Sequence, residues 1–421
     1  MNWSERDRTA DGDVGCPVSL YLHFPFCVQK CRYCDFLSGP ADEAVRKRYL
    51  RALEREVLLS AEDRSPLSVD TLFFGGGTPS LMSGEELEHL MKLLRESFRI
   101  LPDAEITMEC NPGTVDREKL ADFRRAGVNR LSIGVQSFRD EELRLLGRIH
   151  TAGEAERCFL DARAAGFDNI SLDLIGALPG QSSAQWMESL REAVRLSPEH
   201  ISAYSLILED GTPLKEEADA GKLLPVPEEE LDRKMYHDTK TFLAQHGYHR
   251  YEISNYARSG FESRHNSGYW TGHPYLGFGI GAASYFGNRR WSHTRSLVRY
   301  LELLEEKSGG QSSSGPDAFG KRKGGLAGVR QEVPNGLYEE EELLDEKDRM
   351  AEFMFLGLRR MQGVSEEEFE KRFGEKMESV YGPVLRRYQA LHMLERKAGR
   401  VFLTDAGIDV SNAVMADFLP D

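Results

Sequence analysis

The sequence predicts an α/β fold, a partial (β/α)6 barrel of the TIM type followed by a C-terminal helical domain of the winged-helix type. Six apolar, β-like runs alternate with helix-period runs between residues 19 and 206, which indicates a parallel sheet covered by helices. Polar residues stand at the carboxyl ends of several of these runs, and in a barrel those ends form one rim where ligands bind. The alternation alone also allows an open doubly wound sheet.

The expected strands are short apolar runs at residues 19–24, 69–74, 104–109, 129–135, 169–174 and 200–206. Apolar residues at helical spacing predict helices between them, at residues 42–60, 84–98, 116–126, 140–146, 151–165 and 182–196. Further on, we expect a turn at 209–213, an amphipathic helix at 228–246 and a strand at 248–256. The glycines at 277, 279 and 281 lack the spacing of a dinucleotide-binding motif, and we expect close backbone packing against a flat ligand there.

The C-terminal part is expected to contain helices at 347–360 and 382–395, a short helix opened by a capping box at 365–368, a strand at 399–403 and a last helix ending near 418. We therefore divide the chain into an N-terminal arm (1–17), a barrel with an extension (18–300), a flexible linker (301–337) and a C-terminal winged-helix-like domain (338–421). Acidic residues in this last domain favour protein docking or a lid over DNA binding.

Composition excludes some classes of function. The chain has 421 residues and a formal net charge of −15, which argues against nucleic acid as a partner. Its 6 cysteines are sparse for this length and indicate a reducing cytoplasm rather than a disulfide framework. No apolar run approaches the length of a membrane span, and the first residues lack the apolar core of a signal peptide. We expect a cytoplasmic protein with no membrane span.

Three cysteines follow the first strand at C-x3-C-x2-C spacing: Cys27, Cys31 and Cys34. Three thiolates on one loop can hold a [4Fe–4S] cluster and leave one iron open for an exchangeable ligand. A zinc site completed by His23 or another histidine, or unrelated free thiols, are the alternatives.

The polar residues at the strand ends include Gly75–Gly77 with Thr78, then Glu109, Gln136, Asp173 and Tyr204-Ser205. A glycine run lets the backbone pass close to a ligand and present N–H groups to a carboxylate. The run lacks the Lys-Ser/Thr of a phosphate-binding loop. A tight turn between a strand and a helix remains the alternative interpretation.

The residues from Tyr21 to Phe36 resemble the signature of the radical S-adenosylmethionine (SAM) superfamily. More widely, the chain resembles the oxygen-independent coproporphyrinogen III oxidase-like branch of that superfamily, and within it the HemW-type haem chaperones. The motifs that carry this resemblance are Y-x-H-x-P-F-C (21–27), F-G-G-G-T-P (74–79), E-x-N-P-G (109–113), S-I-G-V-Q-S-F (132–138), R-x-H (148–150), D-L-I-x-x-L-P-G (173–180) and H-N-x-x-Y-W (265–270).

The resemblance implies that the three cysteines hold a [4Fe–4S] cluster whose open iron is chelated by the amino and carboxylate groups of SAM. It implies SAM contacts from Tyr21, Tyr33, Gly76, Gly77, Thr78, Glu109, Gln136, Arg148 and Asp173. Glu109 or Asp173 can accept from ribose hydroxyls or the ammonium, and Arg148 can pair with the carboxylate. It also implies haem handling by His265, Asn266, Tyr269 and Trp270, because imidazole binds haem iron and aromatic rings face a porphyrin.

The oxidase and chaperone branches of the family differ at one residue position and in the length of one segment. The oxidase has a further cysteine where this chain has Phe36, and a longer arm before the first strand. We therefore expect a haem chaperone that carries the cluster and SAM, takes electrons from a donor, and transfers haem to an acceptor protein. Conversion of coproporphyrinogen III to protoporphyrinogen IX is the alternative. The resemblance implies a capacity to cleave SAM but assigns no catalytic residue. Ala283, where many relatives have histidine, and the enlarged segment 307–336 depart from the family.

Overall fold

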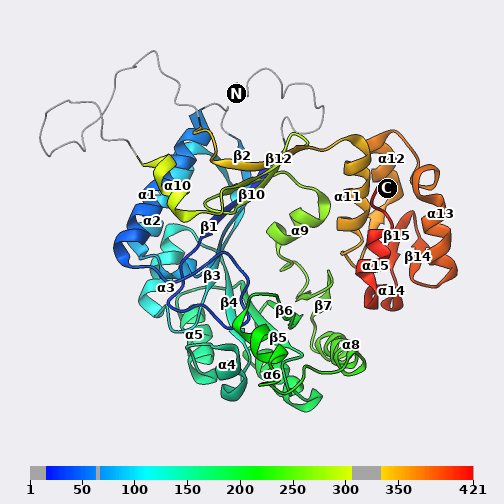
Figure 1. Ribbon diagram of the computed structural model, residues 1–421, viewed down its shortest axis with the longest axis horizontal. Helices are drawn as coiled ribbons and strands as arrows, with labels where there is room; N and C mark the ends of the chain where they lie inside the picture. The colour runs from blue at the N-terminus through cyan, green and yellow to red at the C-terminus, as the bar shows by residue number, and fades with distance from the viewer. Residues whose placement is uncertain (1–15, 63–66, 306–332, 421) are drawn as a thin grey trace, which may run out of the picture.

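A computed structural model of the chain describes residues 16–62, 67–305 and 333–420, and Figure 1 shows the arrangement of its elements. Six consecutive parallel strands curve into a partial barrel, each paired with the next along the chain. This confirms the predicted fold class. The strands are β1 (Val18–Phe24), β2 (Ser68–Gly76), β3 (Arg99–Cys110), β4 (Arg130–Gln136), β5 (Ile170–Gly176) and β6 (His200–Ser205).

Helices cover the outer face of this sheet and follow the predicted positions closely: α1 (Glu43–Glu62), α2 (Gly84–Ser97), α3 (Arg117–Ala126), α4 (Asp140–Leu146), α5 (Ala152–Ala164) and α6 (Ser183–Leu196). Three of them begin at reciprocal capping boxes, with Ser83, Thr151 and Ser182 as the N-cap residues. Each such cap satisfies backbone N–H groups that a helix leaves unpaired, which fixes where the helix starts.

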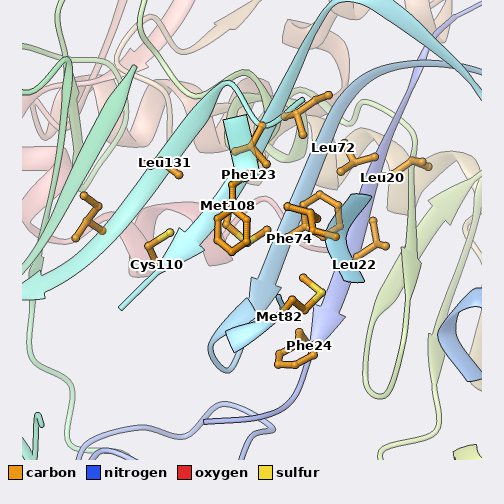
Figure 2. Packing of buried hydrophobic residues seen from close by; sticks show 14 of the residues in the cluster. Leu20, Leu22, Phe24, Leu72, Phe74, Met82, Met108, Cys110, Phe123 and Leu131 are labelled. Atoms are coloured by element: carbon orange, nitrogen blue, oxygen red, sulfur yellow. The ribbon is translucent and has the colours of Figure 1, made fainter. Parts of the chain in front are cut away.

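Successive side chains of each strand point to opposite faces of the sheet, one toward the helices and one toward the inside of the barrel. Leu20, Leu22 and Phe24 of β1 pack with Leu72 and Phe74 of β2 in the core beneath the helices (Figure 2). The residues between them on each strand face the inside of the barrel. Truncating a fully buried leucine such as Leu72 to alanine costs about 2–5 kcal/mol of stability, so the outer layer holds the strands in place while the inner face is free to carry function.

The sheet continues beyond the six parallel strands on both sides. β9 (Tyr275–Phe278) pairs in parallel with β1, and β10 (Ala283–Phe286), β11 (Arg289–His293) and β12 (Tyr338–Leu343) add antiparallel strands. At the other edge, β8 (Asn255–Ala257) and β7 (His249–Arg250) form a hairpin beside β6. The single strand predicted at 248–256 is therefore two short strands with a turn between them. The helices of this region are α7 (Pro213–Asp219), α8 (Glu229–Gln245), α9 (Arg264–Thr271) and α10 (Leu297–Leu304).

The close backbone packing expected at the glycines at 277–281 is found, and at Gly277 and Gly279 it is against the protein's own chain. A Cβ at Gly277 would lie 2.3 Å from the carbonyl oxygen of Ala283, and one at Gly279 would lie 2.3 Å from the hydroxyl oxygen of Tyr49. The missing side chains make room for the protein's own chain, at the point where β9 turns back toward β10.

Most of the predicted linker, residues 306–332, lies outside the described residues, as does most of the predicted N-terminal arm. The described ends of the linker belong to the barrel's own structure, since α10 runs to Leu304 and the Leu337 carbonyl oxygen accepts from the N–H of Thr294 at 2.9 Å. The next strand, β12, begins at Tyr338 and pairs with β11. The boundary at residue 338 therefore falls just before a strand of the large sheet.

The C-terminal domain has its own core, which includes Phe369, Leu385 and Phe418. A three-stranded sheet in the order β13 (Val364–Ser365), β15 (Arg400–Leu403), β14 (Leu394–Lys397) packs with its helices. Ser365 caps its helix by accepting from the N–H of Glu368, without the reciprocal bond of the predicted capping box. The helices are α11 (Glu346–Gly357), α12 (Glu366–Phe373), α13 (Met377–Ala390), α14 (Asp405–Asp409) and α15 (Ser411–Ala416).

Helix α13 begins at Met377, five residues before the predicted start, because buried Met377 anchors an extra turn and Pro383 lies inside the helix. Figure 1 places α9 between the large sheet and α11 of the C-terminal domain, and α9 contacts both β2 and α11. Among the described residues, no helix is both long and apolar enough to cross a membrane.

Candidate functional site

A cavity of about 630 Å³ opens on the inner face of the partial barrel. It gathers every predicted cluster and SAM residue, together with three of the four predicted haem residues. The residues in question are Tyr21, Cys27, Cys31, Tyr33, Cys34, Gly76, Gly77, Thr78, Glu109, Gln136, Arg148, Asp173, His265, Asn266 and Tyr269. Trp270 is not among the residues that line the cavity.

Strand register explains how distant segments share one surface. Tyr21 pairs with Phe73, Phe73 with Thr107, and Thr107 with Arg130, so these residues form one layer across β1–β4. The next layer of inward-facing residues lies two positions further along the strands, toward their carboxyl ends. It joins Glu109 to Ser132, Ser171 and His200. Inward residues of parallel strands stack in such layers in a barrel. The polar residues that the sequence places at strand ends therefore face one another.

The cysteine loop is tied to β1 through His23. The Nε2–H of His23 donates to the carbonyl oxygen of Leu37 at 3.0 Å, which leaves Nδ1 to accept from the Tyr21 hydroxyl at 3.0 Å. Burial lowers the pKa of His23, so the ring is neutral. Since both nitrogens are occupied, His23 is not available as a fourth zinc ligand and instead positions the loop.

The loop is also held by helices that follow later in the chain. The Cys27 N–H donates to the carbonyl oxygen of Gly39 at 3.0 Å, and the Arg32 N–H donates to that of Leu146 at 3.0 Å. The Arg32 side chain forms an ion pair with Glu217 of α7. The loop conformation thus depends on α4 and α7 as well as on β1.

The three thiols fit a cluster better than a single ion. In the part of the chain that the structure describes, no three His, Cys, Asp or Glu side chains converge closely enough to hold one metal ion. A [4Fe–4S] cluster needs a wider spacing, because each thiolate binds a different iron. Burial raises the pKa of the Cys34 thiol, and its neighbours Cys31 and Cys27 act in the same direction.

Arg148 stands next to the cysteine loop. Its Nη1 donates to Sγ of Cys31 at 3.4 Å, and its Nη2 donates to the Gly134 carbonyl oxygen at 2.7 Å and to the side chain of Asn111. Its Nε is buried without a hydrogen-bond partner in the described structure. The guanidinium is thus fixed beside one predicted cluster ligand with donor capacity left over.

Two carboxylates lie on neighbouring parts of the cavity wall. Glu109 accepts from the N–H of Gly76 at 3.1 Å, and Asp173 accepts from the hydroxyls of Ser132 at 2.8 Å and Ser171 at 3.0 Å. Burial, and then the charge of Asp173, raise the pKa of Glu109 to about 8. A ligand with hydrogen-bond donors or positive charge would therefore be favoured at this position.

Helix α9 presents His265 and Tyr269 to the cavity. The His265 Nδ1–H donates to the Thr71 hydroxyl oxygen at 2.7 Å, because that hydroxyl itself donates to Ser19. Nε2 then accepts from the Tyr269 hydroxyl at 3.0 Å. Burial lowers the pKa of His265 to about 3. The lone pair that could bind iron is therefore occupied by Tyr269.

Trp270 was expected to face a porphyrin together with Tyr269, but the structure places its side chain outside the cavity that Tyr269 lines. The Arg359 guanidinium of the C-terminal domain lies 4.6 Å from the centre of the Trp270 ring. Consecutive residues on a helix point about 100° apart, so Tyr269 faces the cavity while Trp270 faces the other domain.

Sequence reasoning missed several residues that line the cavity. The most unusual is Arg130, the first residue of β4, which is 2% exposed. Its signal was the two-residue period along β4, because the inward residues are Arg130, Ser132, Gly134 and Gln136, and all four line the cavity. Others that were missed are Phe73, Asn111 and Ser202.

Comparisons with known proteins show which families this chain is similar to. The chain matches the Radical SAM superfamily over residues 21–193 and the HemN C-terminal domain over residues 344–410. It is 35% identical to the heme chaperone HemW of Bacillus subtilis, over 95% of this chain and 99% of that protein. It is 43% identical to the heme chaperone HemW of Escherichia coli, over 63% of this chain and 69% of that protein. The solved structure of coproporphyrinogen III oxidase (HemN) from Escherichia coli superposes with a TM-score of 0.78 at 23% identity, covering 96% of this chain and 90% of that one. This last likeness shows the fold.

Proposed function

This chain belongs to the HemW heme chaperone family of radical SAM proteins, and from that membership we propose that it binds haem and transfers it to an acceptor protein. The cofactors implied by the family are a [4Fe–4S] cluster and SAM. The observation that carries the proposal is one cavity that joins the cysteine loop to His265 and Tyr269 of α9. A protein that handles haem beside a cluster needs both sets of residues within reach of one bound molecule.

In this proposal the three loop cysteines hold the cluster, which supplies electrons and an open iron for SAM when it is bound. His23 fixes the loop in position through Leu37. Arg148 neutralises negative charge near Cys31, since its guanidinium already touches that sulfur. Glu109 and Asp173 accept hydrogen bonds from SAM, as their place on the cavity wall supports.

Haem is proposed to bind along α9, with His265 as the iron ligand. Its neutral imidazole is suited to ligation, and Nε2 becomes available once the Tyr269 hydroxyl moves away. Phe73 stacks on His265 at 5.0 Å between ring centres and offers an apolar face beside it. Asn266 and Tyr269 complete the proposed contact surface, and Trp270 takes no part in it.

The alternative activity, oxidation of coproporphyrinogen III, is less well supported. Phe36 is 67% exposed and lines the mouth of the cavity, and its ring neither donates a proton nor exchanges a thiol. The structural likeness to the oxidase supports a shared fold and not a shared reaction.

The test is a parallel assay with cluster-reconstituted protein under reducing, oxygen-free conditions. We expect stoichiometric haem binding, seen as a shifted Soret band, and no conversion of coproporphyrinogen III when SAM and a strong reductant are present. The His265→Ala variant should lose the haem band and keep the cluster. Steady formation of protoporphyrinogen with deoxyadenosine in step would instead move the protein to the oxidase branch.

A further inference from the structure

We propose that Arg130 binds a propionate carboxylate of haem at the inner end of the cavity, an inference that rests on the proposed haem-binding function. Nothing in the cluster or SAM assignments uses this residue. It lies one layer below Glu109 on the inner face of the barrel, level with Tyr21 and Phe73.

Arg130 is a buried cation without a partner. Its side chain is 2% exposed and is the largest of the fully buried side chains. Across residues 16–62, 67–305 and 333–420, its guanidinium forms no ion pair and no hydrogen bond, and its Nε is buried with nothing to accept from it. A buried charge that lacks a counter-ion is strongly unfavourable. The unpaired guanidinium therefore points to a role in binding an anion.

The groups around Arg130 do not neutralise it. His200 accepts from the Tyr251 hydroxyl through Nε2 at 2.9 Å and donates to Ser171 through Nδ1 at 2.8 Å. Burial first, and then the charge of Arg130, lower the pKa of His200, so this ring is neutral. Burial and the same charge also act to lower the pKa of His265. The ring nitrogens of both histidines are occupied by neutral partners.

The nearby carboxylates are engaged elsewhere. Glu105 accepts from the N–H groups of Arg264 at 3.1 Å and His265 at 3.0 Å, and so caps the start of α9. Asp173 accepts from two serine hydroxyls. Neither carboxylate lies within ion-pair distance of Arg130. The missing counter-ion must therefore come from a molecule in the cavity, and this is the cavity that Arg130 lines.

A carboxylate suits this site because guanidinium groups bind carboxylates through two parallel hydrogen bonds. Both SAM and haem carry carboxylates. In this family SAM uses its carboxylate to chelate the cluster iron, and Arg148 rather than Arg130 stands beside the cysteine loop. Haem presents its carboxylates at one edge of a flat apolar ring. Phe73, in the same layer as Arg130, and Tyr269 supply aromatic faces for such a ring.

The experiment compares haem with its dimethyl ester, in which both propionates are neutral. Absorbance titrations use the full-length, cluster-reconstituted wild type and the Arg130→Gln and Arg130→Lys variants. Wild type should bind haem at least tenfold more tightly than the ester. Arg130→Gln should bind both ligands as weakly as wild type binds the ester, and Arg130→Lys should keep part of the preference. Arg144→Gln, at an exposed position of α4, is the matched control and should behave as wild type.

Each outcome bears on the proposal separately. Equal binding of haem and ester by wild type overturns it without any variant, and so does a haem preference that survives in Arg130→Gln. A loss of SAM affinity in Arg130→Gln, with haem binding unchanged, assigns the residue to the SAM carboxylate instead. Failure of wild type to bind either haem or ester rejects the proposed function itself. We also expect Arg130→Gln to melt no earlier than wild type, because it removes an unpaired buried charge.

Discussion

Replacing Gly77 with alanine is expected to release the cluster and not merely to weaken SAM binding. The sequence suggested that this glycine leaves room for a ligand. In the structure it leaves room for the protein's own cysteine loop, because an alanine Cβ would lie 2.8 Å from the carbonyl oxygen of Phe26, 2.9 Å from its nitrogen and 3.0 Å from the carbonyl oxygen of Phe24. All three atoms are backbone, so no flexible side chain can move aside.

The expected loss of stability follows from the backbone atoms of Phe24 and Phe26 that an alanine Cβ would displace. Two hydrogen bonds connect this turn to the loop, from Gly77 N–H to Phe24 and from Thr78 N–H to Phe26, both at 2.8 Å. Overpacking a tight site costs about 1–3 kcal/mol, and each weakened hydrogen bond adds about 0.5–1.5 kcal/mol. We therefore expect a loss of about 2–6 kcal/mol. Because Cys27 directly follows Phe26, the displacement reaches the first cluster ligand.

The assay measures iron and sulfide content after anaerobic reconstitution, together with the urea midpoint of unfolding. Gly153→Ala, where a Cβ meets no atom within 4 Å, is the matched control and should retain both values. If Gly77→Ala holds a full cluster and unfolds at the wild-type midpoint, the close packing between the glycine turn and the cysteine loop is not what positions Cys27.

Three further results are expected. Serine variants of the three loop cysteines should each lose the cluster's visible absorption, and serine variants of the other three cysteines should keep it; full absorption in any loop variant would contradict the ligand assignment. The pKa of Glu109 is raised to about 8, so the carboxylate forms as pH rises toward 8. SAM affinity should therefore increase by up to about tenfold for each pH unit of that rise. Calorimetry should find a shallower pH dependence for Glu109→Gln. Burial lowers the pKa of His293 and pairing with Glu56 raises it, with a net rise above 6.5. The stabilising contribution of His293 is therefore complete below pH 6.5 and is lost as pH rises through the raised pKa. The urea midpoints of wild type and His293→Gln should converge at alkaline pH, and a constant difference between them would refute this.

The parallel strands and their helices could be predicted because local signals agree there. β-branched and apolar runs, capping residues such as Ser83 and Ser182, and short connections all point to the same elements. The strands β9–β12 could not be predicted in this way. β9 joins the sheet beside β1, far away in the sequence, and β12 pairs with β11 across residues 306–332. Such pairing depends on tertiary packing, which leaves no periodic pattern in a short strand.

The cluster and SAM residues could be located because each stands at a strand end or in a motif, and strand ends meet on one rim. Arg130 escaped notice because it begins its strand and reads as an ordinary exposed charge. The two-residue period along β4 puts it on the same face as Ser132, and the register, which sets it level with Thr107 on β3, shows that this face points inward. Its missing partner is visible only once the surrounding groups are placed.

Helix α9 shows why a motif does not by itself define a binding surface. In the sequence, His265 to Trp270 looks like one segment that faces one ligand. Folded as a helix, it divides between two neighbours, with His265 and Tyr269 four residues apart on the cavity side and Trp270 against Arg359. The hydrogen bond between His265 and Tyr269 requires that four-residue spacing. The rotation that creates this bond also turns Trp270 toward the C-terminal domain, so the same helix is a wall of the cavity and a contact between domains.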